Sequence, residues 1–302
     1  RWSVWIIKEI LGLHYRPKTK EYNARVSIVT PVYNENPRVF LQALGSWKKN
    51  NPSEIIAVID YTDLQCIKIF EKFKETFSGA ELIITKVPGK RQALADGIKA
   101  AKSEIVALVD SDTIWDKNVL RNGLPPFCDA RVAGVATYQS VLRPKTFAQK
   151  IFDIQLDLRY RHEYPFLAGS GDALVCLSGR TAFYRREAIL NDKYDNIHDL
   201  RHEFFLGTRG ISGDDKRLTH LIIEQGWQVS FALGAEVFTP GLGSIGKFLK
   251  QRLRWTRNSW RADLRAIKKK WAWRHPALAI FMIDRFIQPF FMLLGPVACA
   301  LA

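Results

Sequence analysis

The feature that most constrains the fold is an alternation, through about the first 115 residues, of short apolar runs with longer amphipathic segments. The apolar runs have the length and β-branched content of buried strands, and the segments between them repeat apolar residues at helical spacing. The expected strands cover 25–32, 54–60, 81–87 and 104–109, and the expected helices lie within 37–49, 62–77 and 88–102. This order favours an α/β fold with a mainly parallel sheet and helices on both faces.

The second half of the chain contains further strand-like and helical segments. We expect strands at 133–142 and 226–233, a long helix at 147–164, a helix that begins near Asp214 and a basic helix within 247–270. For residues 174–185 we expect two strands joined by a tight turn at Ser178-Gly179. Ligands of open α/β sheets bind beyond the carboxyl ends of the strands, so the polar residues after each strand are the candidates for chemistry.

The charge of the chain indicates an anionic partner. Its 302 residues carry 45 Lys and Arg against 30 Asp and Glu, a formal net charge of +15. Nucleotide phosphates, anionic lipids, acidic polymers and nucleic acid all fit that charge. RNA-binding signatures and a helix-turn-helix pattern are missing from the sequence, so we expect no nucleic-acid partner. The four cysteines lack C-x-x-C spacing, which indicates reduced cysteines in a cytosolic setting.

Both ends of the chain suggest contact with a membrane. Residues 1–22 begin with a segment that mixes Trp, Ile and Leu with basic residues, as an interface helix or the tail of a spanning helix does. An ordinary amphipathic surface helix is the alternative. Residues 276–302 are mostly apolar, and we favour the start of a transmembrane region over a buried core helix. The expected division is therefore 1–22, a cytosolic domain at 23–246, basic interface helices at 247–275, and 276–302.

Two pairs of aspartates are candidates for chemistry. Asp110 and Asp112 follow an apolar strand, and carboxylates at this spacing can approach one Mn²⁺ or Mg²⁺ ion. A solvated loop with an Asx turn is the structural alternative. Asp214 and Asp215 lie at a predicted helix start, where a carboxylate can act as a general base or simply cap the helix.

Basic and aromatic residues form the second group of candidates. Gln251, Arg252, Arg254 and Trp255 lie in the basic helix; arginine suits phosphate oxygens, and tryptophan offers a flat face to a sugar ring. A basic helix that faces a membrane is the alternative. Lys90 precedes a predicted helix whose N-terminus favours phosphates.

In order, the segments TPVYNEN, VID, GKR, DSD, SGRTAFYRRE, GDD and QRLRW resemble the membrane-bound processive family 2 glycosyltransferases, which include the cellulose, chitin and hyaluronan synthases. The similarity covers about residues 25 to 270, and the hyaluronan synthase branch is the most similar. Arg180 follows Ser-Gly where hyaluronan synthases commonly have Pro, which keeps chitin-oligosaccharide synthases as an alternative. The resemblance implies a GT-A-like domain with a mixed, mainly parallel twisted sheet, flanked by amphipathic interface helices and truncated transmembrane segments.

The resemblance also implies roles for single residues. Asp60 and Lys90 would hold the nucleotide, Asp110 would contact it, and Asp112 would bind the metal. The expected base is Asp215, with Asp214 in reserve. The implied acceptor site is Ser178, Gly179, Arg180 and Trp255, and the implied phosphate site is Gln251, Arg252 and Arg254.

The implied reaction is inverting, metal-dependent transfer from a UDP-sugar to a growing polysaccharide. The implied location is a multi-pass membrane protein with a cytoplasmic catalytic domain and membrane lipids as partners. The alternatives are a non-processive membrane transferase that adds one sugar to a lipid or short glycan, or another polysaccharide synthase.

Overall fold

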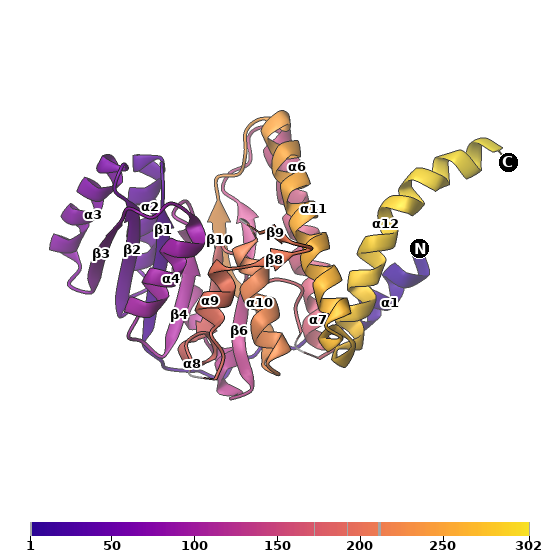
Figure 1. Ribbon diagram of the computed structural model, residues 1–302, viewed down its shortest axis with the longest axis horizontal. Coiled ribbons are helices and arrows are strands. Elements are labelled where there is room, and N and C mark those ends of the chain that lie inside the picture. The colour runs from indigo at the N-terminus through magenta and orange to yellow at the C-terminus, as the bar shows by residue number, and fades with distance from the viewer. Residues whose placement is uncertain (1, 172, 192, 211–212, 302) are drawn as a thin grey trace.

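A mixed eight-stranded sheet forms the centre of the computed structural model, which describes residues 2–171, 173–191, 193–210 and 213–301 (Figure 1). In sheet order the strands are β3 (Ala80–Thr85), β2 (Glu54–Asp60), β1 (Val26–Val32), β4 (Ile105–Val109), β7 (Thr181–Arg185), β6 (Val132–Val141), β10 (Gln228–Thr239) and β5 (Ile114–Trp115). The pairs β3–β2, β2–β1, β1–β4 and β6–β10 are parallel, and β7 runs antiparallel to both of its neighbours. The predicted mixed, mainly parallel sheet is confirmed.

The first three crossover helices cover both faces of this sheet. They are α2 (Pro37–Lys48), α3 (Leu64–Thr76) and α4 (Lys90–Ala100). Side chains of α2 and α3, such as Trp47 and Phe70, pack with Ile28 in one apolar core. Side chains of α4 pack with Val29 and Val58 in the other core. Adjacent strand residues point to opposite faces, so a continuous apolar strand contributes side chains to both cores.

The predicted hairpin at 174–185 is wrong in its first half. Only Thr181–Arg185 is a strand, because both edges of β7 are already paired, with β4 and β6. The residues before it lie under helix α10 (Asp214–Glu224), where the Leu177 backbone N–H donates to the Thr219 hydroxyl at 2.8 Å. A side chain thus satisfies a backbone donor that a second strand would have satisfied.

The remaining elements follow β5 in the chain. The predicted long helix is α6 (Phe147–Leu158), which continues through a π-helical turn (Arg159–Glu163) into α7 (Tyr164–Gly169). The predicted basic helix is α11 (Ile245–Lys268). The shorter elements are α5 (Val119–Gly123), α8 (Arg186–Ile189), α9 (Asn196–Arg201), β8 (Phe204–Phe205), β9 (Thr208–Arg209) and 3₁₀ turns at Pro125–Cys128 and Trp271–Arg274.

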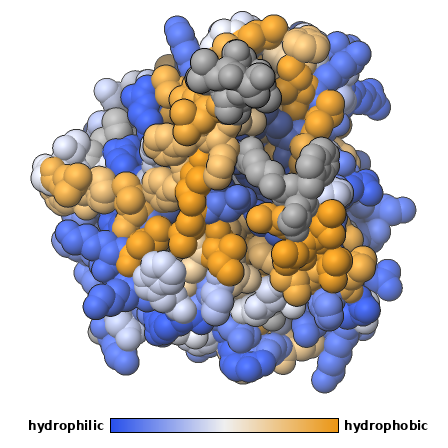
Figure 2. All heavy atoms as spheres, turned by 90° about the vertical axis from the view of Figure 1, so that its right-hand side faces the viewer, coloured by the Kyte–Doolittle hydropathy of each residue, from blue (hydrophilic) through white to orange (hydrophobic). Residues whose placement is uncertain are grey.

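The terminal helices α1 (Trp2–Gly12) and α12 (Pro276–Leu301) lie together at one end of the molecule (Figure 1). Lys8 of α1 and Asp284 of α12 form an ion pair at 2.6 Å. Figure 2 faces this end and shows apolar side chains spread across it; exposed apolar residues there include Trp5, Ile6, Ile10, Ile287, Phe290 and Phe291.

One helical stretch among the described residues, Pro276–Leu294, is long and apolar enough to cross a membrane. Only 22% of it is buried, so it is not enclosed as a core helix would be. One such stretch does not support the multi-pass topology that the sequence suggested.

Two helical glycines test the packing of the sheet against its helices. A Cβ on Gly97 of α4 would lie 2.4 Å from Val29 Cγ1, whereas a Cβ on Gly45 of α2 meets nothing within 4 Å. We expect Gly97→Ala to lower the free energy of unfolding by about 1–3 kcal/mol through overpacking. Gly45→Ala, the matched control, should raise it by about 0.5–1 kcal/mol. Equal effects in chemical denaturation would contradict this packing.

Candidate active site

A cavity of about 370 Å³ lies at the carboxyl edge of the sheet, between β4, β10, α10 and α11. It collects predicted site residues from segments far apart in the chain: Lys90, Asp110, Asp112, Ser178, Gly179, Arg180, Asp214, Asp215, Gln251, Arg254 and Trp255. Parallel strands end at a common edge, which is why residues that follow different strands meet here.

Two predicted residues, Asp60 and Arg252, do not line this cavity. Asp60 ends β2, two strands away from β4, and its carboxylate accepts hydrogen bonds from the backbone and hydroxyl of Thr62. The Arg252 guanidinium packs over aromatic rings, 4.9 Å from the centroid of Trp255 and 5.1 Å from that of Phe152. The predicted nucleotide role of Asp60 would therefore require a ligand that extends along the sheet edge.

Lys90 forms ion pairs with two carboxylates in the acidic half of the cavity. Its Nζ lies 2.6 Å from Asp110 Oδ1 and 3.2 Å from Asp214 Oδ2. Burial opposes the charge on Lys90, but the neighbouring carboxylates outweigh burial and raise its pKa. Gly179 permits this approach, because a Cβ there would come within 3.2 Å of Lys90 Nζ and 3.5 Å of Asp110.

Around Asp112, burial and negative charge outweigh the nearby cations Arg180 and Lys90. Burial, then the charges of Asp110 and Glu35, raise its pKa to about 6. A divalent cation beside this carboxylate would relieve that repulsion, so the donor chemistry fits Mn²⁺ or Mg²⁺. The described residues contain no group of three or more His, Cys, Asp or Glu side chains able to hold an ion alone. Phosphate and water oxygens would have to complete the coordination.

The two aspartates of α10 differ in protonation. Gly213 starts this helix with φ of +87°, a left-handed conformation that glycine adopts without strain, and places both aspartates in the first turn. Burial raises the pKa of Asp214, but Lys90 outweighs burial and the net shift is downward. For Asp215, burial and the charge of Asp214 raise the pKa. Asp215 is therefore the better proton acceptor of the pair.

Helix α11 supplies the opposite wall. The Oε1 atom of Gln251 is buried without a hydrogen-bond partner, whereas Arg254 is exposed to the cavity mouth. Two guanidinium groups lie near the ring of Trp255, that of Arg252 at 4.9 Å and that of Arg180 at 5.3 Å from its centroid. This wall offers a hydrogen-bond acceptor, a cation and an aromatic ring to a ligand.

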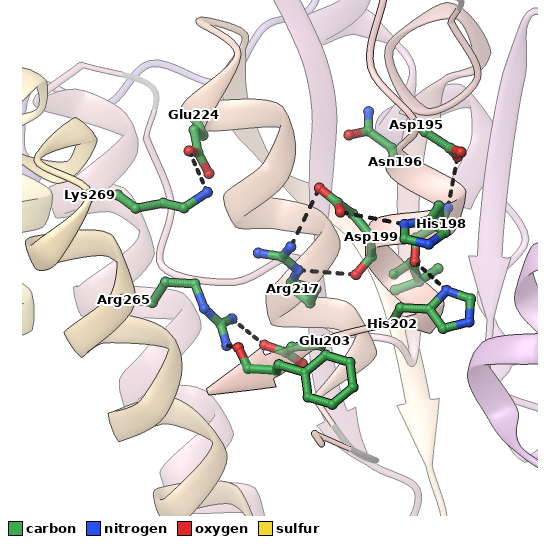
Figure 3. A network of polar contacts seen from close by, with 12 residues as sticks. Asp195, Asn196, His198, Asp199, His202, Glu203, Arg217, Glu224, Arg265 and Lys269 are labelled. Carbon is green, nitrogen blue, oxygen red and sulfur yellow. Dashed lines mark hydrogen bonds and ion pairs between the residues drawn. The ribbon is translucent and has the colours of Figure 1, made fainter. Parts of the chain in front are cut away.

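Ion pairs fix α11 against the rest of the domain (Figure 3). The carboxylate of Glu203 accepts from Arg265 of α11 and from Arg91 of α4. At the end of the helix, Lys269 pairs with Glu224 at 2.8 Å. These contacts fix the C-terminal part of α11, the helix that carries Trp255.

Other cavity residues were not predicted as site residues: Arg159, Lys216, Asn258 and Arg285. Lys216 directly follows the aspartate pair, and Arg285 interrupts an apolar stretch, so both had a sequence signal. Arg159 had none, because it lies among other charged residues of a long helix.

Residues 24–258 match the family model described as "Glycosyltransferase like family 2". This match covers well over half of the chain, and the chain belongs to glycosyltransferase family 2. The predicted enzyme class is confirmed.

Three relatives share more than a quarter of their aligned residues with the chain. The NDP-glycosyltransferase ltbB of Aspergillus luteorubrus is 28% identical, over 95% of this chain and 75% of its own length. A hyaluronan synthase of Streptococcus pyogenes is 28% identical, over 96% and 69%. An N-acetylglucosaminyltransferase of Azorhizobium caulinodans is 27% identical, over 82% and 62%. The chain thus spans between 62% and 75% of the lengths of these relatives.

A solved structure confirms the predicted GT-A-like fold. It is described as mannosyltransferase PcManGT from Pyrobaculum calidifontis in complex with GDP-Man and Mn2+. The TM-score is 0.64 at 18% sequence identity, and the match covers 100% of this chain and 89% of that one.

The Glu203 network yields a stability test. Glu203→Gln leaves two buried guanidinium groups without their carboxylate, and we expect a loss of about 3–5 kcal/mol in the free energy of unfolding. Lys269→Gln breaks a pair whose side chains are 47% and 29% exposed, and we expect a loss below about 1 kcal/mol. Chemical denaturation measures both, and similar losses would contradict the anchoring role of Glu203.

Proposed function

We propose that this chain transfers a sugar from a UDP-sugar to a hydroxyl group of a growing polysaccharide, with inversion at the anomeric carbon, as a hyaluronan-synthase-like polymerase. The observation that carries the proposal is the single cavity shared by Asp112, Asp215, Arg254 and Trp255. The ordered resemblance to processive synthases and the hyaluronan synthase relative support the polymer product.

In the proposed reaction Asp215 acts as the general base. Its raised pKa lets the carboxylate accept the proton of the acceptor hydroxyl, whose oxygen then attacks the anomeric carbon. The bond from that carbon to the departing diphosphate breaks in the same step, so one displacement inverts the centre. Lys90 keeps Asp214 ionised. The proton is therefore taken up by Asp215 and not by Asp214.

The donor side is assigned to charged groups at the cavity. Lys90, Asp110 and Asp60 are proposed for the nucleotide sugar, and Gln251, Arg252 and Arg254 for its phosphates. Asp112 would hold a Mn²⁺ or Mg²⁺ ion, which when bound neutralises charge on the leaving diphosphate.

The acceptor side is proposed to consist of Ser178, Gly179, Arg180 and Trp255. Trp255 presents an aromatic ring to a sugar, and Arg180 donates to Gln139 and Ser178, which fixes its position.

Association with a membrane through α1 and α12 is part of the proposal. The exposed apolar side chains at this end and the one long apolar helix support it. A cytoplasmic orientation of the cavity and a multi-pass whole protein belong to the same hypothesis; Cys66, Cys128 and Cys176 are free thiols, as a reducing compartment requires.

A non-processive transferase is the second candidate. The relatives named NDP-glycosyltransferase and N-acetylglucosaminyltransferase favour it, because their names do not specify a polymer. Product size separates the two: a ladder or high polymer indicates the first function, and a single addition the second.

UDP release across a panel of UDP-sugars, with and without Mn²⁺, tests the reaction. We expect Mn²⁺-dependent release with at least one donor. Asp215→Asn should lower turnover by about 10²–10⁴-fold, because the amide cannot accept the proton. Its affinity for UDP, measured by calorimetry, should stay within about threefold of the wild type. Normal turnover in this variant, with loss of turnover in Asp214→Asn, would transfer the role of base to Asp214.

The proposed metal ligand predicts a pH dependence. Because the pKa of Asp112 is raised to about 6, protons compete with Mn²⁺ below that pH. Affinity for Mn²⁺-UDP should be full above about pH 7 and fall by up to about tenfold per pH unit below 6. Asp112→Asn should bind Mn²⁺-UDP more weakly. Its affinity should also vary less with pH, because only the phosphates then titrate.

Asp116→Asn is the matched control, because Asp116 follows β5 and is not among the cavity residues. Its calorimetric profile should match the wild type. An unchanged metal dependence in Asp112→Asn would place the ligand elsewhere.

A further inference from the structure

The short helix α9 presents two histidines to solvent, one turn apart. Ile197 and Leu200 are buried and hold the helix on the domain. His198 and His202 are both exposed, and Figure 3 shows their rings side by side. Two histidines four residues apart on a helix can bind one metal ion, because both imidazoles lie on the same face. Neither histidine lines the cavity, and the proposed sugar transfer does not use them.

The two rings have nearly the separation that a shared ion requires. Their centroids are 4.4 Å apart, and the ring planes are inclined by 31°. An imidazole nitrogen lies about 2.0–2.1 Å from a bound Zn²⁺, and the centre of the ring lies roughly 1.1 Å further away. Two rings bound at about 90–110° to each other would have centroids about 4.5–5.2 Å apart. The observed separation is close to the lower end of that range, so a small movement of the rings suffices.

The contacts of the two rings leave one nitrogen of each for an ion. His202 Nδ1 lies 3.2 Å from the carbonyl oxygen of His198, and a carbonyl only accepts, so this Nδ1 carries the proton. His198 Nδ1 faces the carboxylate of Asp199 at 3.9 Å, and that negative charge favours a proton on this nitrogen as well. The unprotonated atom of each neutral ring is then Nε2. Metal-bound histidines have this same arrangement, with the second ring nitrogen directed at a carbonyl or a carboxylate.

The pair would supply two ligands of the ion. Asp195 caps the helix by accepting from the His198 backbone N–H at 2.8 Å, and Asp199 pairs with Arg217 at 3.6 Å. In the described part of the chain no third His, Cys, Asp or Glu side chain completes a ligand set, so water would fill the remaining positions. Imidazole suits Zn²⁺, Ni²⁺ and Cu²⁺, whereas the carboxylates of the cavity suit Mn²⁺ or Mg²⁺. The two places therefore differ in the ions that they select.

We propose that His198 and His202 bind one Zn²⁺, Ni²⁺ or Cu²⁺ ion at a site separate from the cavity, and that this ion stabilises the last turn of α9. The helix has six residues, and so short a helix is marginally stable by itself. The next residue, Glu203, accepts hydrogen bonds from Arg91 of α4 and Arg265 of α11. An ion across the last turn would thus stabilise the segment that anchors α11.

Calorimetry on the full chain, without a histidine tag, tests this site. The titrants are ZnCl₂, NiCl₂ and MnCl₂ in a buffer that does not chelate metals. We expect Zn²⁺ and Ni²⁺ to bind at one site with a Kd on the order of 1–100 µM, because two of the four ligands of a structural zinc site contribute roughly half of its binding free energy. Mn²⁺ should bind to this site at least about tenfold more weakly.

Variants then assign the ion to the two histidines. His198→Gln and, separately, His202→Gln should weaken Zn²⁺ binding by at least about tenfold, because one imidazole remains. His14→Gln is the matched control, since His14 is also exposed but follows α1, and it should bind Zn²⁺ as the wild type does. Asp112→Asn should also keep this Zn²⁺ affinity.

The melting temperature measures the effect of the ion on the fold. At free Zn²⁺ about ten times the Kd, that of the wild type should rise by about 2–5 °C, and that of His202→Gln by less than about 1 °C. Without metal, the melting temperature of each variant is the check on its folding.

Two outcomes overturn the site: no Zn²⁺ binding tighter than about 1 mM by the wild type, or a Zn²⁺ affinity that is unchanged in both histidine variants. Loss of Zn²⁺ binding in Asp112→Asn, with retention in His198→Gln, would place the ion in the cavity and overturn the site as well. Mn²⁺-dependent UDP release tests the sugar transfer separately, so the two failures are distinguishable.

Discussion

Four aspartate carboxylates share one cavity with the ammonium group of Lys90, and the arrangement of the site depends on that interaction. Each unpaired buried charge costs several kcal/mol, so the cluster requires compensation. Lys90 compensates Asp110 and Asp214, which leaves Asp112 and Asp215 with raised pKa values. The two carboxylates that form no ion pair with another described residue are the two proposed for the metal and the proton. Uneven distribution of one positive charge therefore separates the roles of chemically identical side chains.

Much of the fold follows from local sequence patterns. The strands up to Val109 were predictable because each is a short apolar run bounded by polar residues, and GDD was recognisable as a helix start. The segment 174–178 was not, because its apolar composition suits a strand while the two edges of β7 are taken by strands distant in sequence. Sheet pairing of this kind depends on tertiary structure, which no local pattern encodes.

The candidate site was predictable to a similar degree and for a related reason. Residues at the ends of strands and helices, such as Asp110 and Asp215, are marked by the change from apolar to polar sequence. Arg159 lies inside a helix, where a charged residue usually faces solvent, and yet it lines the cavity from the π-helical turn that follows α6. Asp60 is the opposite case: it ends a strand, as expected, but that strand is two positions from β4 in the sheet, and Asp60 does not line the cavity.

The buried ion pair between Lys216 and Asp263 has a mechanical consequence. Lys216 directly follows Asp215, and Asp263 belongs to α11, which continues through a short turn into the apolar helix α12. Both side chains are at most 5% exposed, so separating the two groups would leave an unpaired charge in a nonpolar interior. A shift of α11 along its axis would therefore also move the first turn of α10, which contains Lys216. A force applied to α12 from outside the domain would then displace the carboxylate of Asp215.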